Sequence, residues 1–487
     1  MMAEQSWLDR LFQRPWGLLV LALYFASVAG LQLLASPTAE LDQSEQLILS
    51  QHLAWGYTNQ PPLYTWVMWG VFQCTGPSLA ALYLVKVLLL TMMVWAVCGV
   101  ARQLAFSGVQ RQVALSGMFL LPTFVWESQR DLTHSLSAAT FAALTLWAAL
   151  CAVKHGQLWR YALLGVVASA SLLSKHNTVV FLVGLLLALL SDRAWRDQLR
   201  LSGVLLATAV TAALCLPHGL WLLHHQEVLV HTMSKINHGQ GGWLGAGRFL
   251  GDLMGGLVSF LLPWAGLALV VAWRRGLVLK PVNLLARLLA CTFVALVVFV
   301  LAAGADSFKG RWLFPMLFAA PIWLGAVVRP DDRRSARWSA WSAVAVALLC
   351  GVIMPARLVW KMPGAIQTRQ NLPFPEMVID LQRDLGHAPA VVLASSHLVG
   401  GNFRLGLPAG TAVLTPIAPW RSQGASEAVF VASDKDLGDP AMQAWFVSQT
   451  GVQLDQVTWS GELSAPLLHR PGLAPYVLKW ARVPLAR

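Results

Sequence analysis

The sequence predicts a polytopic α-helical membrane protein that ends in a small α/β domain. Hydrophobic residues make up 56% of its 487 positions and charged residues only 12%, whereas soluble domains carry about 25% charged residues. The apolar residues gather in runs that approach the roughly 20 residues needed to cross the hydrocarbon core of a bilayer. From about residue 361 these runs give way to shorter stretches punctuated by Pro, Gly and Asp.

We expect about eleven spans, or more, within residues 1–360. Their predicted ranges are 16–35, 79–100, 112–127, 134–153, 161–174, 177–191, 201–223, 249–273, 284–304, 312–328 and 338–357. The spans at 161–174 and 177–191 are short and meet at a polar sequence, Ser174 to Asn177. This pattern indicates two tilted or broken helices that meet at a polar bend.

The basic residues predict the orientation of the chain. If the N-terminus is cytoplasmic, the loops on its side hold 17 Lys and Arg residues and the opposite loops hold 6, namely Arg130, Lys175, Lys235, Arg248, Lys309 and Arg311. The positive-inside rule therefore predicts a cytoplasmic N-terminus. The net charge of +12 is spread over short loops rather than one face, which argues against nucleic acid as a partner.

Residues 361–487 are predicted to fold as a periplasmic α/β domain, because an odd number of spans places them opposite the N-terminus. The helix is expected to include 377–385. The strands are expected at 390–394, 428–432, 457–460 and 476–480, where β-type residues alternate with turn formers.

The first external loop, residues 36–78, carries the candidate chemistry. Apolar residues at helical spacing predict a juxtamembrane helix from Asp42 to Ala54, with Asp42 in its first turn, where the helix dipole favours a carboxylate. The alternative is that Asp42 only caps this helix and that Glu45 is a solvated side chain.

This loop resembles a known family. Asp42, Ser50-Gln51-His52-Leu53, Gly56-Tyr57 and Pro61-Pro62-Leu63 are similar to the first-loop signature of bacterial dolichyl-phosphate-mannose protein mannosyltransferase-like glycosyltransferases of the GT-C superfamily, which includes the lipid A aminoarabinose transferases. Weaker similarities lie at Arg130-Asp131, at Leu173 to Asn177 and at Lys309 to Pro315. Three positions depart from the signature: Gln43 stands where the family has Glu, and Glu45 and Gln46 stand where it has paired tyrosines.

The resemblance implies a GT-C-like catalytic domain over residues 1–360 in a bacterial inner membrane. It also implies inverting transfer of a sugar from an undecaprenyl-phosphate donor to a hydroxyl of a glycan, lipid or protein acceptor on the periplasmic face. Asp42 matches the family's catalytic base, and a carboxylate can take the proton of an attacking hydroxyl. The developing phosphate charge needs fixed cations, for which the candidates are Lys86, Lys175, Lys235, Arg248, Lys309 and Arg311.

Further candidates have simpler alternatives. Asp131 and Glu45 are candidates to support the acceptor or a divalent cation, although Asp131 would also serve as a helix cap or as a partner of Arg130. The candidate sugar contacts are His52, Trp55, Tyr57 and Trp243, and aromatic residues of this kind also form interfacial belts. The alternative for Lys86 is that its ammonium group only extends to the membrane–water interface and does not bind phosphate.

Two other functions stay open at this point. A lipid-linked saccharide transporter or a non-catalytic scaffold would share the spans and the cationic contacts to lipid phosphate. A ligase or polymerase of related architecture would carry a large periplasmic loop between late spans, whereas the largest external domain predicted here is C-terminal.

Overall fold

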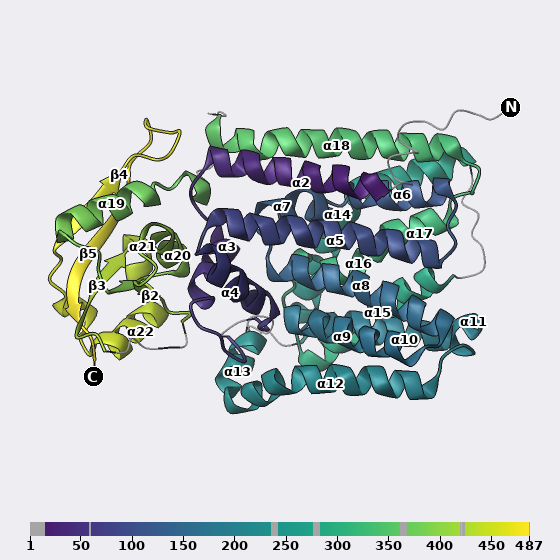
Figure 1. Cartoon of the computed structure of the whole chain (residues 1–487), viewed down its shortest axis with the longest axis horizontal. Helices are drawn as coiled ribbons and strands as arrows, with labels where there is room; N and C mark the ends of the chain where they lie inside the picture. Colours follow the sequence, from purple (N-terminus) through teal and green to yellow (C-terminus); the bar gives the residue numbers. More distant parts are fainter. Residues whose placement is uncertain are drawn as a thin grey trace. The chain divides into compact units, whose positions relative to one another are not determined.

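The structure is a computed structural model that describes residues 15–57, 60–234, 242–275, 283–360, 368–418, 420 and 424–486. The chain divides into two compact units. The first comprises residues 1–26, 59–63 and 86–351, and the second comprises residues 27–58, 64–85 and 352–487. Figure 1 labels most of the helices and strands of both.

Helices build the first unit (Figure 1). They are α2 (Pro15–Ala35, up to residue 26), α5 (Leu79–Gln103, from residue 86), α6 (Gly108–Met118), the π-helix η1 (Thr123–Glu127), α7 (Ser128–Arg130), α8 (His134–His155), α9 (Leu158–Ser174), α10 (Thr178–Ser191), α11 (Arg193–Arg196), α12 (Leu201–His224), α13 (Gln226–Ser234), α14 (Gly242–Arg275), α15 (Leu284–Ala303), the 3-10 helix η2 (Gly310–Leu313), α16 (Phe314–Leu317), α17 (Ala319–Val327) and α18 (Arg333–Val359, up to residue 351).

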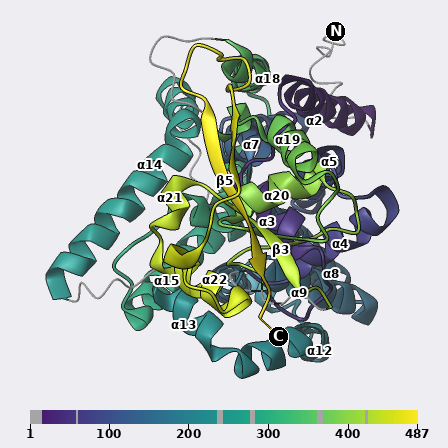
Figure 2. The same cartoon turned by 90° about the vertical axis from the view of Figure 1, so that its left-hand side faces the viewer.

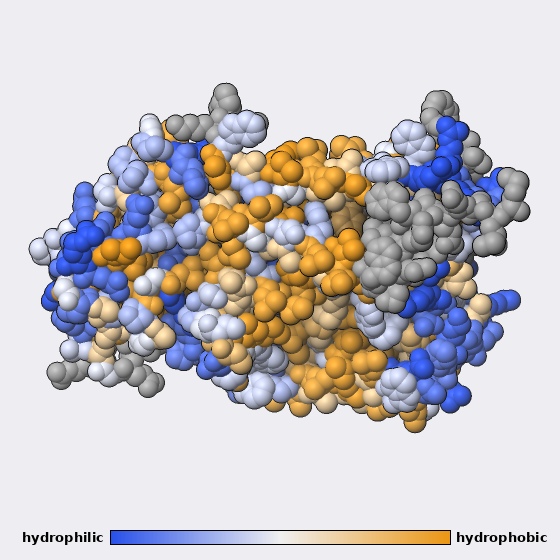
Figure 3. Space-filling view, turned by 45° about the horizontal axis from the view of Figure 1, so that its top comes forward, coloured by the Kyte–Doolittle hydropathy of each residue, from blue (hydrophilic) through white to orange (hydrophobic). Residues whose placement is uncertain are grey.

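Long apolar helices confirm the prediction of a multi-span membrane protein. Among the described residues, seven helices are long and apolar enough to cross a membrane, and a pair bent by 47° at residue 318 raises this number to eight. Their outward side chains are large and apolar, for example Leu205 at 60% exposure and Leu269 at 70%. Figure 3 shows such hydrophobic side chains gathered over the helices, as a lipid-facing surface requires.

Small residues bring the helices of this unit together. A Cβ atom on Gly184 of α10 would lie 2.2 Å from Thr292 Oγ1 of α15, and one on Gly165 of α9 would lie 2.6 Å from the Ala207 carbonyl oxygen of α12. Glycine at these positions allows the backbones to approach closely, which is a common source of packing between membrane helices.

One predicted element of this unit differs from the structure, and another is confirmed. The span expected at 112–127 is interrupted, because α6 ends at Met118 and a separate π-helical turn covers Thr123–Glu127. The polar bend is confirmed: α9 ends at Ser174 and α10 begins at Thr178. The count of eleven spans stays a prediction.

The second unit contains the first loop and the C-terminal residues. Besides the remaining parts of α2, α5 and α18, its elements are α3 (Leu41–Leu49), α4 (Leu63–Thr75), η3 (Arg369–Asn371), α19 (Phe374–Leu385), β1 (Val391–Ala394), α20 (His397–Gly406), β2 (Ala412–Leu414), β3 (Glu427–Ala432), α21 (Asp434–Leu437), α22 (Pro440–Thr450), η4 (Leu454–Gln456), β4 (Gly461–Ala465) and β5 (Tyr476–Pro484).

A five-stranded sheet organises this unit, with the strand order β2-β1-β3-β5-β4. Strands β2, β1 and β3 run parallel, and β5 pairs antiparallel with both β3 and β4. Figure 2 shows β3 and β5 crossing this unit. One face of the sheet packs against α19 and α20 and the other against α22, so alternate residues of each strand enter different cores.

The strand expected at 457–460 is wrong. These residues precede β4, which begins at Gly461 and pairs with β5 from that position. The helix expected from Asp42 to Ala54 is shorter than predicted, because α3 ends at Leu49.

Candidate functional site

In the first unit, two buried lysines contact the segment 129–135, which runs from α7 into the first turn of α8. Lys86 of α5 is 3% exposed and donates from Nζ to the Gln129 carbonyl oxygen at 3.3 Å. Lys175, at the bend between α9 and α10, is 8% exposed and donates to Ser135 Oγ at 2.7 Å. Since charged groups are costly to bury in a membrane protein, a buried pair of this kind usually marks a functional site.

Asp131 belongs to the same short segment and is also buried. Arg130 forms an ion pair with Glu127 at 2.9 Å. The N-cap of α8 is Thr133, so the alternative in which Asp131 caps the following span is wrong. The segment therefore combines one buried carboxylate with two ammonium groups that reach its ends.

Hydrogen bonds from neighbouring helices fix the bend that carries Lys175. Ser174 Oγ lies 2.8 Å from Ser137 Oγ of α8, and Thr178 Oγ1 donates to the Lys175 carbonyl oxygen at 2.8 Å. His176 Nε2 lies 3.3 Å from His218 Nε2 of α12. The Thr178 hydroxyl satisfies a backbone carbonyl freed by the broken helix, and the two side-chain contacts join the bend to α8 and α12.

The other predicted cations differ from this pair. Arg248, Lys309 and Arg311 are exposed. Lys235 lies outside the described residues, and so does the side chain of Trp243. Two of the six candidate phosphate ligands, Lys86 and Lys175, are therefore buried, and both contact residues of the same stretch, 129–135.

In the second unit, α3 carries Asp42 in its first turn, as predicted. Its N-cap is Glu40, so the alternative in which Asp42 caps the helix is wrong. The Glu40 side chain is 2% exposed and lies 3.6 Å from the Arg357 guanidinium. Asp42 itself is only partly buried.

The capping box explains why Gln43 is compatible with this helix. The Glu40 backbone N–H donates to Gln43 Oε1 at 3.0 Å, while the Glu40 side chain accepts from the Gln43 backbone N–H. An amide supplies the acceptor oxygen of this motif as well as a carboxylate does. It also avoids a second negative charge beside the buried Glu40.

Helix α3 is docked on α20 of the C-terminal region. Asn402 accepts from the Ala39 backbone N–H at 2.7 Å and donates to Ser44 Oγ at 3.2 Å. A Cβ atom on Gly401 would lie 2.6 Å from both the Cα atom and the carbonyl oxygen of Ser44. The backbones of α3 and α20 are therefore in close contact. The Asn402 side chain hydrogen-bonds polar groups at the N-terminal end of α3.

The residues after α3 join the edge of the sheet. Gln51 donates to the Val413 carbonyl oxygen at 2.7 Å and accepts from the Val413 backbone N–H at 3.0 Å. The Gln51 side chain thereby pairs with the backbone N–H and carbonyl of the edge strand β2, which would otherwise be open to pairing with a further strand. Arg404 of α20 donates to the Leu47 carbonyl oxygen, and burial lowers the pKa of Arg404 to about 10.

A larger side chain at Gly401 is expected to detach α3. Gly401→Leu places atoms against the Ser44 backbone. Overpacking of this kind lowers the free energy of unfolding by about 1–3 kcal/mol. Hydrogen–deuterium exchange should then be faster over residues 41–49, with activity lowered. Gly410→Leu is the matched control, because a Cβ atom there meets nothing within 4 Å. Unchanged exchange in Gly401→Leu would contradict this docking.

The predicted sugar contacts of the first loop have different surroundings. His52 packs against Trp420 with ring centroids 4.5 Å apart. Partial burial lowers the pKa of His52, and the positive charge of Arg404 lowers it further. Tyr57 is buried and donates its hydroxyl to the His52 carbonyl oxygen at 2.8 Å. Trp55 is 60% exposed. His52 is also exposed, so Tyr57 is the one of the three that is buried.

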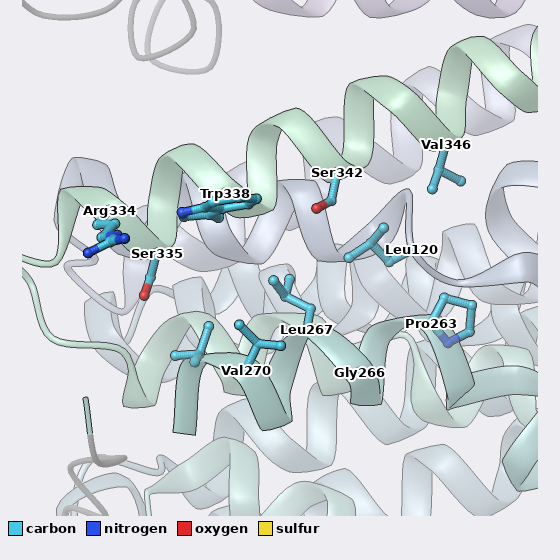
Figure 4. Close-up of a pocket in the computed structure, with 11 residues that line it drawn as sticks. Leu120, Pro263, Gly266, Leu267, Val270, Arg334, Ser335, Trp338, Ser342 and Val346 are labelled. Atoms are coloured by element: carbon cyan, nitrogen blue, oxygen red, sulfur yellow. The ribbon is translucent and has the colours of Figure 1, made fainter. Parts of the chain in front are cut away.

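A groove of about 510 Å³ lies between α14 and α18, and Figure 4 shows its apolar lining with Arg334 and Trp338 at one end. None of the predicted site residues lines it. Within the described part of the chain, no group of three or more His, Cys, Asp or Glu residues could hold a metal ion.

Comparisons with known proteins agree on one class. A family model described as dolichyl-phosphate-mannose-protein mannosyltransferase matches residues 59–221. The fold is similar to that of ArnT from Cupriavidus metallidurans bound to undecaprenyl phosphate, with a TM-score of 0.60, 13% identity, and coverage of 96% of this chain and 98% of that one.

Two curated relatives from Rhizobium johnstonii extend this similarity over most of the chain. The lipopolysaccharide core galacturonosyltransferase RgtB is 29% identical over 422 residues, which are 83% of each chain. A second lipopolysaccharide core galacturonosyltransferase, RgtA, is 28% identical over 405 residues, which are 80% of each chain. The chain is a membrane glycosyltransferase, and its fold is similar to that of ArnT. This result favours a glycosyltransferase over the two non-enzymatic alternatives, a lipid-linked saccharide transporter and a non-catalytic scaffold.

Sequence reasoning missed the residues that hold α3 in this glycosyltransferase. Asn402, Gly401, Arg404 and Gln51 act between segments more than 350 residues apart in the chain. The sequence Gly400-Gly401-Asn402 carries a local signal, since two glycines inside a helix are unfavourable unless another backbone must come close.

Proposed function

We propose that this glycosyltransferase moves a sugar from an undecaprenyl-phosphate donor to a hydroxyl of a lipid-linked glycan, and that Lys86 and Lys175 bind the donor phosphate. The observation that carries this proposal is the burial of both lysines against the segment from Gln129 to Ser135. Two fixed cations in a site of low dielectric stabilise the charge that develops on a departing phosphate. Undecaprenyl phosphate bound to ArnT supports this class of donor.

Asp42 is the proposed general base. The acceptor oxygen attacks the anomeric carbon from the face opposite the phosphate, and Asp42 takes the hydroxyl proton. The bond between the anomeric carbon and the phosphate oxygen breaks, and its electron pair leaves with the polyprenyl phosphate. One displacement of this kind inverts the anomeric configuration. The position of Asp42 in the first turn of α3, partly exposed, supports this role.

The relatives suggest the identities of the sugar and the acceptor. Two lipopolysaccharide core galacturonosyltransferases align with at least 80% of this chain. We therefore propose a galacturonosyl donor and a sugar of the lipopolysaccharide core as acceptor. A uronic acid would add one more negative charge for the cationic residues to bind.

The remaining candidates complete the proposal. Arg248, Lys309, Arg311 and Lys235 would contact the charged groups of the donor, and Asp131 and Glu45 would support the acceptor or a divalent cation. His52, Trp55, Tyr57 and Trp243 would contact sugars. The N-terminus would be cytoplasmic, residues 1–360 would form the catalytic membrane domain with about eleven spans, and residues 361–487 would lie in the periplasm of a bacterial inner membrane.

Product analysis tests this function directly. Purified protein in proteoliposomes is mixed with isotope-labelled undecaprenyl-phosphate galacturonic acid and lipopolysaccharide, and the products are analysed by mass spectrometry. We expect a new glycosidic bond on the core and release of undecaprenyl phosphate. Movement of the labelled lipid across the bilayer without a new bond would contradict the proposal.

A further inference from the structure

Polar side chains gather where the parallel strands of the C-terminal sheet end. Ser395 and His397 follow β1, and Ser433 and Asp436 follow β3. Ser395 Oγ donates to Asp436 Oδ2 at 2.7 Å, which joins the two strand ends. In sheets with parallel strands, ligands commonly bind in the crevice outside the carboxyl ends of the strands.

His397 stands between this edge and the helix that carries Asp42. It is the first residue of α20, and it shares a helix face with Gly400, Gly401 and Arg404, which lie three, four and seven positions later. Those three residues contact Ile48, Ser44 and Leu47 of α3, respectively. His397 therefore continues the face of α20 on which α3 is docked.

Asp42 and His397 lie on the accessible rim of this interface. The docked residues Ser44, Gly401 and Asn402 are buried, whereas Asp42 and His397 are both only partly buried. Burial lowers the pKa of His397, and the Asp42 carboxylate opposes this effect by favouring the protonated ring.

The chemistry of the His397 ring suits a sugar. Within the described part of the chain, no hydrogen bond to this ring is found. A neutral imidazole offers one donor and one acceptor, and a sugar hydroxyl needs both from its surroundings. Ser396, which precedes it, makes no side-chain cap to α20, so a second hydroxyl is present at the same helix end.

We propose that His397 binds the acceptor sugar, by hydrogen bonding a hydroxyl adjacent to the one that Asp42 deprotonates. The rim between α3 and α20 is then the acceptor subsite, and the C-terminal region supplies one of its walls. This inference deepens the proposed function and depends on Asp42 as its base. It also explains why the helix carrying Asp42 is docked on α20.

Binding of a saccharide without donor tests this inference separately from the transfer reaction. Core oligosaccharide released from lipopolysaccharide is titrated by calorimetry into the full-length protein, wild type and variants. We expect His397→Ala to weaken binding at least tenfold and His397→Asn, which keeps a donor and an acceptor, to restore part of it. His387→Ala is the control, because His387 is an exposed residue of the same region.

Steady-state transfer supplies the second measurement. The KM for the acceptor should rise at least tenfold in His397→Ala, while the affinity for undecaprenyl phosphate stays at the wild-type value. Oligosaccharide binding equal to wild type in His397→Ala would overturn the inference, as would a fall in kcat with the acceptor KM unchanged. Binding that depends on His397 without any transfer by the wild type would support the subsite and refute the proposed function.

Discussion

Replacing Asp42 with Asn is expected to lower kcat by about 10²- to 10⁴-fold, the usual contribution of a general base. The amide has the size of the carboxylate, but at neutral pH it cannot take up the proton of the attacking hydroxyl. The capping box of α3 uses Glu40 and Gln43 rather than Asp42, so the helix should stay folded. Single-turnover transfer from a labelled polyprenyl-phosphate sugar measures the effect.

The control for this variant is Asp380→Asn. Asp380 lies on α19 of the same unit, where it pairs with Arg383 at 2.6 Å on an exposed surface, and its loss should leave turnover unchanged. Binding of undecaprenyl phosphate should be equal in Asp42→Asn and wild type, because the proposed phosphate ligands are lysines. Wild-type turnover in Asp42→Asn would remove this residue from the mechanism.

Replacing Lys86 or Lys175 with Met is expected to weaken binding of undecaprenyl phosphate by about 10- to 100-fold each, since a hydrogen bond to a charged group contributes about 1.5–3 kcal/mol. Met fills a similar volume without the charge, so the buried sites should tolerate it. Native mass spectrometry of the lipid complex gives the affinities without any need for turnover.

The double variant sharpens this test. If both ammonium groups hold one phosphate, the two losses should couple rather than add. Lys154→Met is the matched control, because Lys154 is an exposed lysine in the last turn of α8, where it donates to the Gln103 carbonyl oxygen. Lipid affinity that is unchanged in both single variants and in the double variant would refute the assignment.

Features set by neighbouring residues could be predicted from the sequence. Apolar runs mark the long helices because the spanning length is a local property. The interruption at Lys175 could be located because polar residues separate two short runs. The position of Asp42 in the first turn of α3 follows from the spacing of the apolar residues after it.

Features set by distant contacts could not be predicted. Asn402 and Gln51 read as ordinary polar residues, and only the fold brings them to Ala39 and Val413. The strand expected at 457–460 fails for the same reason, because β4 pairs with β5 only from Gly461. The burial of Lys86 against the Gln129 carbonyl also depends on tertiary packing, whereas its position in the sequence suggests a lysine at the membrane interface.

An experimental structure with bound undecaprenyl phosphate tests the central claim most directly. We expect the phosphate oxygens within hydrogen-bonding distance of the Nζ atoms of both Lys86 and Lys175, with the prenyl chain extending into apolar surroundings. A phosphate bound elsewhere, with both lysines still directed at Gln129 and Ser135 and out of reach of the lipid, would contradict the account.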